Sequence, residues 1–275
     1  MNLPPPPTTN SQDSVRPLHA RPPSLLLLAL ELRAAAEMGT LLPGWPVLAR
    51  APRGDGHPVV VFPGLSANDL TTAPLRRYIR SLGYRVRGWE QGANFGTRAG
   101  VLDKARANLA RTFEETGRKV SLVGWSLGGI YARELAKEAP HMVRCVITLG
   151  TPFAGSHRST NAWRLYQLVS GQDIETEAAR YNLQAAPPVP TTSIYSRSDG
   201  IVAWQASLQQ DGHAETENVE VRASHIGLGL NPAAYWIVAD RLAQAEGHWT
   251  PFSRSPGNRL QQLLFPDPLR PHRGG

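Results

Sequence analysis

The chain has 275 residues, of which 41% are hydrophobic, so one globular domain with a sizeable core and short tails is the simplest organisation. The formal net charge is +7, but the arginines are scattered along the chain, and we expect no nucleic-acid partner. Cys145 is the only cysteine, which excludes an intrachain disulfide.

The N-terminal part of the sequence divides into a polar tail and a leucine-rich run. Residues 1–23 are rich in Pro, Ser, Thr and Asn, which predicts a disordered tail. The run Leu25–Leu30 is too short to span a bilayer. Because Glu31 and Arg33 end this run early, we interpret 24–38 as a helix packed on the domain, with an export signal as the alternative. A cytoplasmic location is therefore expected, and a secreted or periplasmic one is the alternative.

From residue 57 onward, short apolar, β-branched runs alternate with longer segments of helical period. The alternation indicates βαβ units and an α/β fold, with a mainly parallel sheet covered by helices on both faces. We expect one domain over 24–247 and an irregular tail over 248–275. The predicted strands cover 58–62, 84–89, 120–123, 143–149, 190–195 and 219–221, and the predicted helices cover 72–82, 101–116, 127–138 and 233–245.

One stretch interrupts the alternation. Between Thr151 and Pro190 no clear strand is found, and the pattern favours short helices. Insertions at such places can cover an active site, so we interpret about 156–189 as a small helical cap. A surface helical pair without a gating role is the alternative.

The segment Gly124-Trp125-Ser126-Leu127-Gly128 joins the strand at 120–123 to the helix at 127–138. A nucleophile elbow requires this strand–turn–helix context. Glycines on both sides of the serine let the backbones approach closely, and the helix N-terminus favours developing negative charge. We therefore predict that Ser126 is a nucleophile rather than the N-cap of a glycine-rich turn.

A serine hydroxyl is a poor nucleophile without a base, and the base is expected to be a histidine. His225 follows the strand at 219–221 and precedes a glycine-containing stretch, so it lies where a base belongs, at the carboxyl end of a strand. We predict His225 as the base, with His213 and His248 as the alternatives.

The histidine in turn needs an acid to orient it. Asp199 follows the strand at 190–195 and precedes Gly200, which allows a turn. We predict Asp199 as the acid. Asp173 and Asp211 are competitors, but neither directly follows a predicted strand.

An oxyanion hole needs two backbone donors. The N–H of Leu127, next to the nucleophile, is one candidate, and the N–H of Leu65, in the loop after the first predicted strand, is the other. Aromatic side chains near the predicted loops are candidates for the substrate pocket, although each has core packing as its alternative. They are Trp125, Phe153, Trp163 and Trp204.

With these pieces placed, the chain resembles the α/β-hydrolase superfamily, especially its bacterial lipases and esterases. The resemblance rests on five segments in the same chain order: Phe62–Leu65, Gly124–Gly129, Thr148–Gly155, Ser198–Val202 and Ser224–Gly227. One departure is Pro63-Gly64, where those lipases usually carry His-Gly, and it weakens any transfer of substrate detail.

The resemblance implies an α/β-hydrolase fold and a serine esterase or lipase that uses Ser126, His225 and Asp199 without cofactor or metal. The implied partner is a small-molecule or lipid ester, with transient contact to a lipid surface. An acyltransferase with the same triad is the main alternative, followed by a thioesterase or amidase. A binding protein on this fold would normally have lost a triad member, and all three are present.

Overall fold

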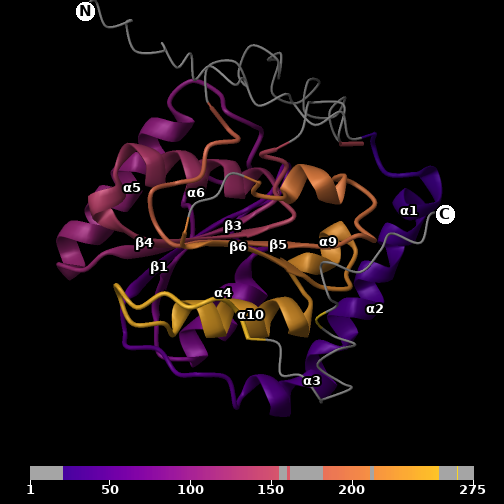
Figure 1. Cartoon of the computed structure of the whole chain (residues 1–275), viewed down its shortest axis with the longest axis horizontal. Coiled ribbons are helices and arrows are strands. Elements are labelled where there is room, and N and C mark those ends of the chain that lie inside the picture. Colours follow the sequence, from indigo (N-terminus) through magenta and orange to yellow (C-terminus); the bar gives the residue numbers. More distant parts are fainter. Residues whose placement is uncertain (1–20, 155–159, 162–181, 211–213, 254–264, 266–275) are drawn as a thin grey trace, which may run out of the picture.

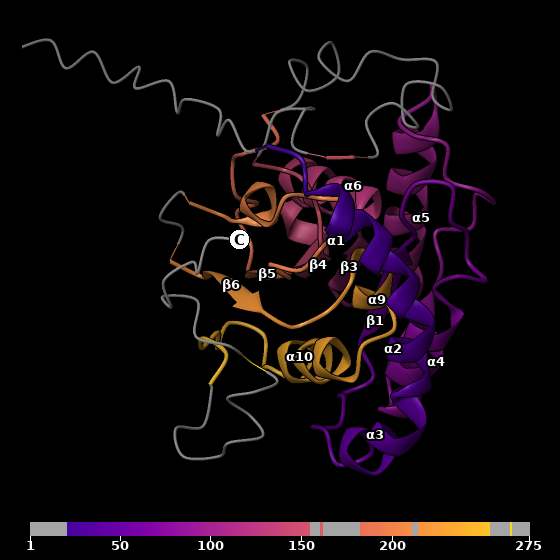
Figure 2. The ribbon, with the colours of Figure 1, turned by 90° about the vertical axis from the view of Figure 1, so that its right-hand side faces the viewer.

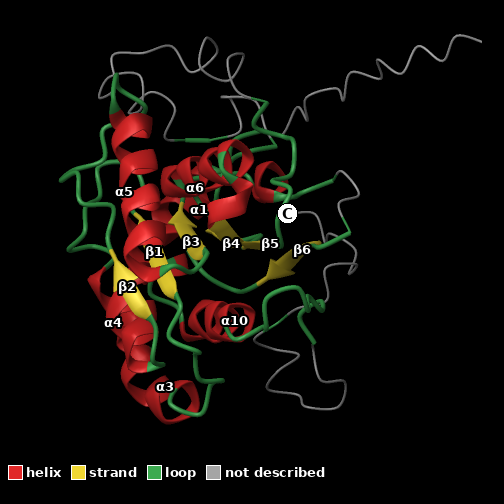
Figure 3. Ribbon diagram, turned by 90° about the vertical axis from the view of Figure 1, so that its left-hand side faces the viewer, coloured by secondary structure: helices red, strands yellow, loops and turns green. Residues whose placement is uncertain are grey.

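A computed structural model describes residues 21–154, 160–161, 182–210, 214–253 and 265 of the chain. Within these ranges six strands form one parallel sheet in the order β2-β1-β3-β4-β5-β6 (Figure 3), which confirms the predicted fold class. The strands are β1 (Pro58–Phe62), β2 (Arg85–Arg87), β3 (Val120–Trp125), β4 (Val143–Leu149), β5 (Thr191–Tyr195) and β6 (Thr216–Glu220).

Helices cover both faces of this sheet (Figure 1). One face carries α5 (Val101–Thr116) and α6 (Leu127–Glu138), and the other carries α3 (Leu41–Leu48), α4 (Ala73–Ser81) and α10 (Pro232–Leu242). The shorter helices are α1 (Leu25–Ala29), η1 (Leu30–Arg33), α2 (Ala34–Gly39), η2 (Pro140–Met142), η4 (Trp204–Ser207) and α9 (His225–Leu228). Among the described helices, none combines the length and the apolar character that crossing a membrane requires.

Successive side chains of β1 point to opposite faces of the sheet, so this short strand contributes to both hydrophobic clusters. Val59 and Val61 pack with the side chains of α4 and α10, whereas Val60 and Phe62 pack with those of α5 and α6. All five residues of β1 are buried. A strand covered on both faces reads as a continuous apolar run, which is how the sequence shows it.

In open α/β sheets, ligands bind at the carboxyl ends of the strands where the strand order reverses. The chain passes from β1 to β2 on one side and then returns to form β3 on the other side of β1. The order therefore reverses between β1 and β3, and loops that follow these two strands diverge at their carboxyl ends. Ser126 follows β3, and the loop with Leu65 follows β1.

The N-terminal segment forms helical turns over Leu25–Gly39 that lie alongside α9 (Figure 2). The next helix, α3, was not predicted, and it contains Pro43 and Pro46, two residues that disfavour a helix. Pro43 lies in its first turn, where a backbone N–H has no partner within the helix, so the missing donor costs little there. Most of the expected cap at 156–189, and most of the two expected tails, lies outside the described residues.

Candidate active site

The turn at Ser126 depends on the glycines around it. Ser126 has φ 53°, a left-handed conformation that a residue with a side chain rarely adopts. A Cβ on Gly124 would lie 2.3 Å from the Cα of Gly129, and one on Gly128 would lie 2.3 Å from the carbonyl oxygen of Phe62. The Ser126 N–H donates to the Leu149 carbonyl at 2.8 Å. The spacing of the glycines thus lets the strained turn hold the hydroxyl at the carboxyl end of the sheet.

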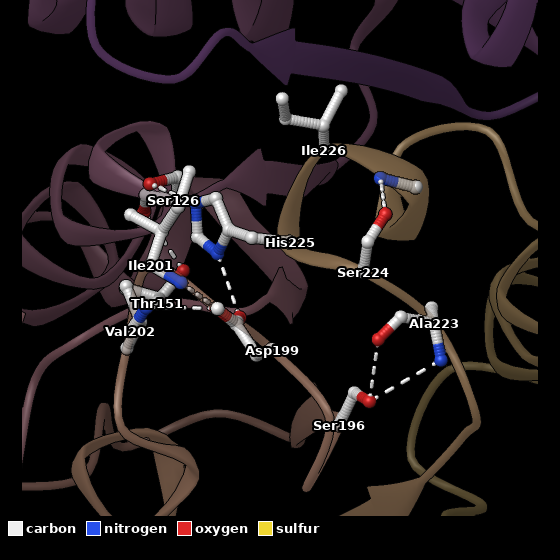
Figure 4. A network of polar contacts seen from close by, with 12 residues as sticks. Ser126, Thr151, Ser196, Asp199, Ile201, Val202, Ala223, Ser224, His225 and Ile226 are labelled. Atoms are coloured by element: carbon white, nitrogen blue, oxygen red, sulfur yellow. Dashed lines mark hydrogen bonds and ion pairs between the residues drawn. The ribbon is translucent and has the colours of Figure 1, made fainter. Parts of the chain in front are cut away.

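The three side chains predicted as nucleophile, base and acid meet at this edge (Figure 4). His225 Nε2 lies 2.9 Å from Ser126 Oγ, and His225 Nδ1 lies 2.7 Å from Asp199 Oδ2. Both His225 and Asp199 are buried, whereas Ser126 is partly exposed. Of the alternatives, His248 is an exposed residue in the segment after α10, while His213, Asp173 and Asp211 lie outside the described residues.

The acid is fixed by its own loop. Oδ1 of Asp199 accepts hydrogen bonds from the N–H groups of Ile201 at 2.8 Å and Val202 at 2.7 Å. Oδ2 is therefore left to face His225. The Ser196 hydroxyl connects the acid loop to the histidine loop, since it donates to the Ala223 carbonyl at 2.7 Å and accepts from the Ala223 N–H at 3.2 Å (Figure 4).

The environment of His225 favours its protonated form. Burial by itself lowers the pKa of this imidazole, but the charge of Asp199, the hydrogen bond to Asp199 and the charge of Glu31 together raise the pKa above its ordinary value. In the neutral ring, Nδ1–H donates to Asp199, which leaves Nε2 free to accept the hydrogen of the Ser126 hydroxyl. The arrangement can take a proton from the serine and stabilise the imidazolium that results.

The loop that carries Leu65 touches the serine turn, which leads into α6 at Leu127. Gly64 packs against Ser126, since a Cβ there would lie 3.2 Å from the Ser126 Cβ. In the described part of the chain, neither the Leu65 N–H nor the Leu127 N–H donates to a protein oxygen. Both remain available to a substrate oxygen.

Comparison with known proteins gives structural matches but no sequence matches. No protein-family model and no curated protein matches the chain. Lipase B of Aspergillus fumigatus superposes with a TM-score of 0.55 at 19% identity, over 69% of this chain and 52% of that lipase. A structure from the work on LipS and LipT, two metagenome-derived lipolytic enzymes, superposes with a TM-score of 0.54 at 15% identity, over 70% of this chain and 93% of that one. The mature lipase BlEst2 of Bacillus licheniformis superposes with a TM-score of 0.53 at 17% identity, over 71% of this chain and 95% of that lipase.

The chain has the α/β-hydrolase fold. It spans about half of the Aspergillus lipase and nearly all of the Bacillus lipase. The predicted resemblance to lipases and esterases is thus confirmed at the level of the fold.

The aromatic residues predicted for the pocket of this α/β-hydrolase fold have different surroundings. Trp125 donates its indole N–H to the His225 carbonyl at 3.1 Å, so it lies directly beside the site. Phe153 is buried, with the Arg133 guanidinium 3.7 Å from its ring centre. Trp204 stacks on Tyr195. Trp163 lies outside the described residues, and a pocket role for these side chains stays a prediction.

Two further residues support the site: Asn94, which the sequence suggests only as part of a loop near the cleft, and Glu31, whose role the sequence does not show. Asn94 is fully buried and donates from Nδ2 to the Pro63 carbonyl at 2.8 Å, while its Oδ1 accepts from the Tyr131 hydroxyl at 2.9 Å. It fixes the loop that carries Leu65. Glu31 accepts from the His225 N–H at 2.8 Å across a long sequence separation. No local pattern signals such a contact, although an acidic residue in a leucine-rich helix is an unusual feature that could have raised the question.

The described residues contain no cluster of three or more His, Cys, Asp or Glu side chains arranged to hold a metal ion.

Proposed function

We propose that the chain is a serine hydrolase that cleaves carboxylic esters through an acyl-enzyme on Ser126. The observation that carries the proposal is the position of His225, which bridges Ser126 Oγ at 2.9 Å and Asp199 Oδ2 at 2.7 Å at the carboxyl edge of the sheet. A fixed serine, base and acid in this order are the parts that nucleophilic catalysis on an ester requires.

Acylation begins when Ser126 Oγ attacks the carbonyl carbon and His225 Nε2 takes the hydroxyl proton. The carbonyl oxygen gains negative charge, which the N–H groups of Leu65 and Leu127 stabilise. The C–O bond to the alcohol then breaks, and the imidazolium gives its proton to the leaving alcohol. Asp199 holds the ring tautomer and stabilises the imidazolium throughout.

Deacylation repeats these steps with water as the nucleophile. His225 removes a proton from water, the hydroxide attacks the acyl carbon, and the proton returns to Ser126 as the acid product leaves. An acceptor alcohol in place of water would make the same site an acyltransferase. Hydrolysis in the presence of added alcohols, with analysis of both products, separates the two activities.

We also propose transient contact with the lipid phase that carries the ester. Leu25, Leu26 and Leu32 are largely exposed, and they lie on the segment that packs against α9, the helix that begins at His225. Exposed apolar groups beside a site favour an apolar surface as the partner. A rate increase when the substrate begins to aggregate supports this part, and saturation on soluble p-nitrophenyl esters alone contradicts it.

A fluorophosphonate probe tests the chemistry directly, because it reacts with an activated serine. Labelling that maps to the Ser126 peptide, together with turnover across a series of ester chain lengths, is the expected result. Labelling at another residue, or an unlabelled protein that hydrolyses no ester, would overturn the proposal.

A further inference from the structure

The N-terminal segment has its polar and apolar sides exchanged relative to an ordinary surface helix. Glu31 is only 6% exposed, whereas the neighbouring Leu32 is 87% exposed. A surface helix normally turns its apolar face to the core and its charges to water. Burial of a carboxylate is unfavourable unless hydrogen bonds compensate for the lost water, so the contacts of Glu31 need an explanation.

Three backbone N–H groups donate to the Glu31 carboxylate, one from the loop of the proposed acid and two from the start of α9, which carries the proposed base. Oε1 accepts from the N–H of Gly200 and from the N–H of His225, each at 2.8 Å. Oε2 accepts from the N–H of Ile226 at 3.0 Å. Gly200 directly follows Asp199, so a single carboxylate oxygen joins the residue after the acid to the base itself.

Close packing fixes the segment over these loops. A Cβ on Gly200 would lie 2.2 Å from the carbonyl oxygen of Leu27. Arg33 donates to the carbonyl of Ser198 at 2.7 Å and to its hydroxyl at 2.8 Å. The segment therefore meets the acid loop on both sides of Asp199.

Within the described residues Glu31 forms no ion pair, so its contacts to the acid loop and to the start of α9 are hydrogen bonds from neutral amides. The negative charge of Glu31 also acts with that of Asp199 to raise the pKa of the His225 imidazole. Glu31 thus acts on the base both through the backbone and through its charge.

We propose that Glu31 is a positioning residue for the base, holding the backbone of His225 against that of Gly200 so that the imidazole stays between Asp199 and Ser126. The inference rests on the proposed function. It adds to that function a carboxylate outside the Ser-His-Asp set, supplied by the N-terminal helical segment.

The experiment compares the wild type with E31Q, E31A and the control E37Q across a pH series, with kcat and KM measured on a soluble ester. Glu37 is a matched control, because it lies on the same segment and accepts from the Ser224 N–H but does not touch His225. Its charge is also paired with Arg33 at 2.9 Å. Thermal unfolding of each variant accompanies the kinetics.

E31Q should lower kcat with little change in KM, since one of the three amides loses its acceptor and the ester contacts are unaffected. The acid limb of its kcat/KM profile should move to lower pH, because loss of the charge lowers the pKa of His225. E31A should lower kcat further, by about 100-fold, as expected for a misplaced catalytic group. E37Q should keep the acid limb of the wild type.

Unchanged kcat and an unchanged acid limb in E31Q would overturn the proposal, as would an equal shift in E37Q. If E31A does not fold, the isosteric E31Q decides. Titration of the His225 imidazole by NMR gives a readout that does not need turnover. A wild type that neither hydrolyses esters nor reacts with the probe, but whose His225 pKa falls in E31Q, would refute the proposed function and leave the electrostatic role of Glu31 standing.

Discussion

The described part of the molecule contains two Ser-His-Asp arrays, in each of which a histidine contacts both a serine and an aspartate. One lies at the carboxyl ends of the strands, here called the carboxyl edge, and the other at their amino ends, here called the amino edge. At the carboxyl edge His225 bridges Ser126 and Asp199. At the amino edge His57 Nε2 lies 2.8 Å from Ser121 Oγ, and His57 Nδ1 lies 2.5 Å from Asp55 Oδ1. Ser121 and Ser126 are five residues apart on and just beyond β3, which corresponds to about 16 Å of extended chain.

The two histidines differ in charge environment although each contacts a carboxylate. The pKa of His57 is lowered to about 4, chiefly by burial and further by the charges of Arg144 and Arg118. The hydrogen bond to Asp55 and the charge of Asp55 raise the pKa, but they do not outweigh these effects. Asp55 is about half exposed and contacts both of these arginines. Asp199 is buried, and the additional charge of Glu31 helps to raise the pKa of His225. The charges around the carboxylate thus decide which imidazole can readily hold a proton.

The two serines differ in backbone and access. Ser121 lies fully buried within β3, in register with Cys145, whose Sγ lies 3.3 Å from its hydroxyl. Ser126 has left the sheet in a left-handed turn, is partly exposed, and begins a helix whose first N–H is free for a ligand. A Ser-His-Asp arrangement is thus not sufficient for a nucleophilic site, which also needs an exposed serine and backbone amides beside it that are free to donate.

The largest expected difference is in turnover after loss of each serine hydroxyl. S126A should lower kcat by about 10⁴ or more, because no nucleophile remains. S121A should retain wild-type kcat and probe labelling, since Ser121 has no access to substrate. Steady-state kinetics on a soluble ester measures both. Turnover by S126A close to that of the wild type would remove the distinction between the two arrays.

Substitution of each aspartate by asparagine should give the next largest difference in kcat between the two arrays. D199N should lower kcat by about 10³ to 10⁴, because the amide no longer favours the tautomer in which Nε2 accepts the serine proton. D55N should change kcat by less than about twofold, because Asp55 acts at the other edge of the sheet. The same kinetic assay serves, and a large loss in D55N would show that the amino edge affects catalysis.

The fold and the serine turn could be predicted because their signals are local. β1 and β4 are apolar runs, and Gly124 and Gly128 stand at the positions where a side chain would clash. The proximity of Asp199 and His225 to Ser126 could be predicted as well, because each follows a strand whose carboxyl end lies near Ser126.

Other features could not be predicted, because they depend on contacts between distant segments. Glu31 meets His225 across 194 positions, and nothing near either residue specifies that contact. The contact from His57 to Ser121 spans 64 positions and depends on the pairing of β1 with β3. β6 begins at Thr216 rather than at the predicted 219, because polar residues at a sheet edge carry no apolar signal.

His57, the histidine at the amino edge, should make the free energy of unfolding depend on pH. The pKa of His57 is lowered in the folded protein to about 4, so between about pH 6.5 and 4 the unfolded chain binds a proton that the folded chain does not. This contribution to stability is complete above pH 6.5 and is lost as pH falls toward 4, amounting to about 3 kcal/mol.

Urea unfolding at several pH values, on the wild type and on H57Q, measures that contribution. The difference between the two unfolding free energies should shrink by about 3 kcal/mol as pH falls from 7 to 4. Parallel pH profiles for the two proteins would mean that His57 is protonated in the folded state, contrary to its burial.

The smallest expected effect separates the two serines in the opposite sense. S121A should lower the free energy of unfolding by about 1 kcal/mol, because the buried Nε2 of His57 loses its partner and no water replaces it. S126A should change that free energy by less than about 0.5 kcal/mol, since water can reach the Nε2 of His225 through the partly exposed site. Urea unfolding at pH 7 measures both variants. A larger loss in S126A than in S121A would indicate that the proposed catalytic array, rather than the buried one, stabilises the fold.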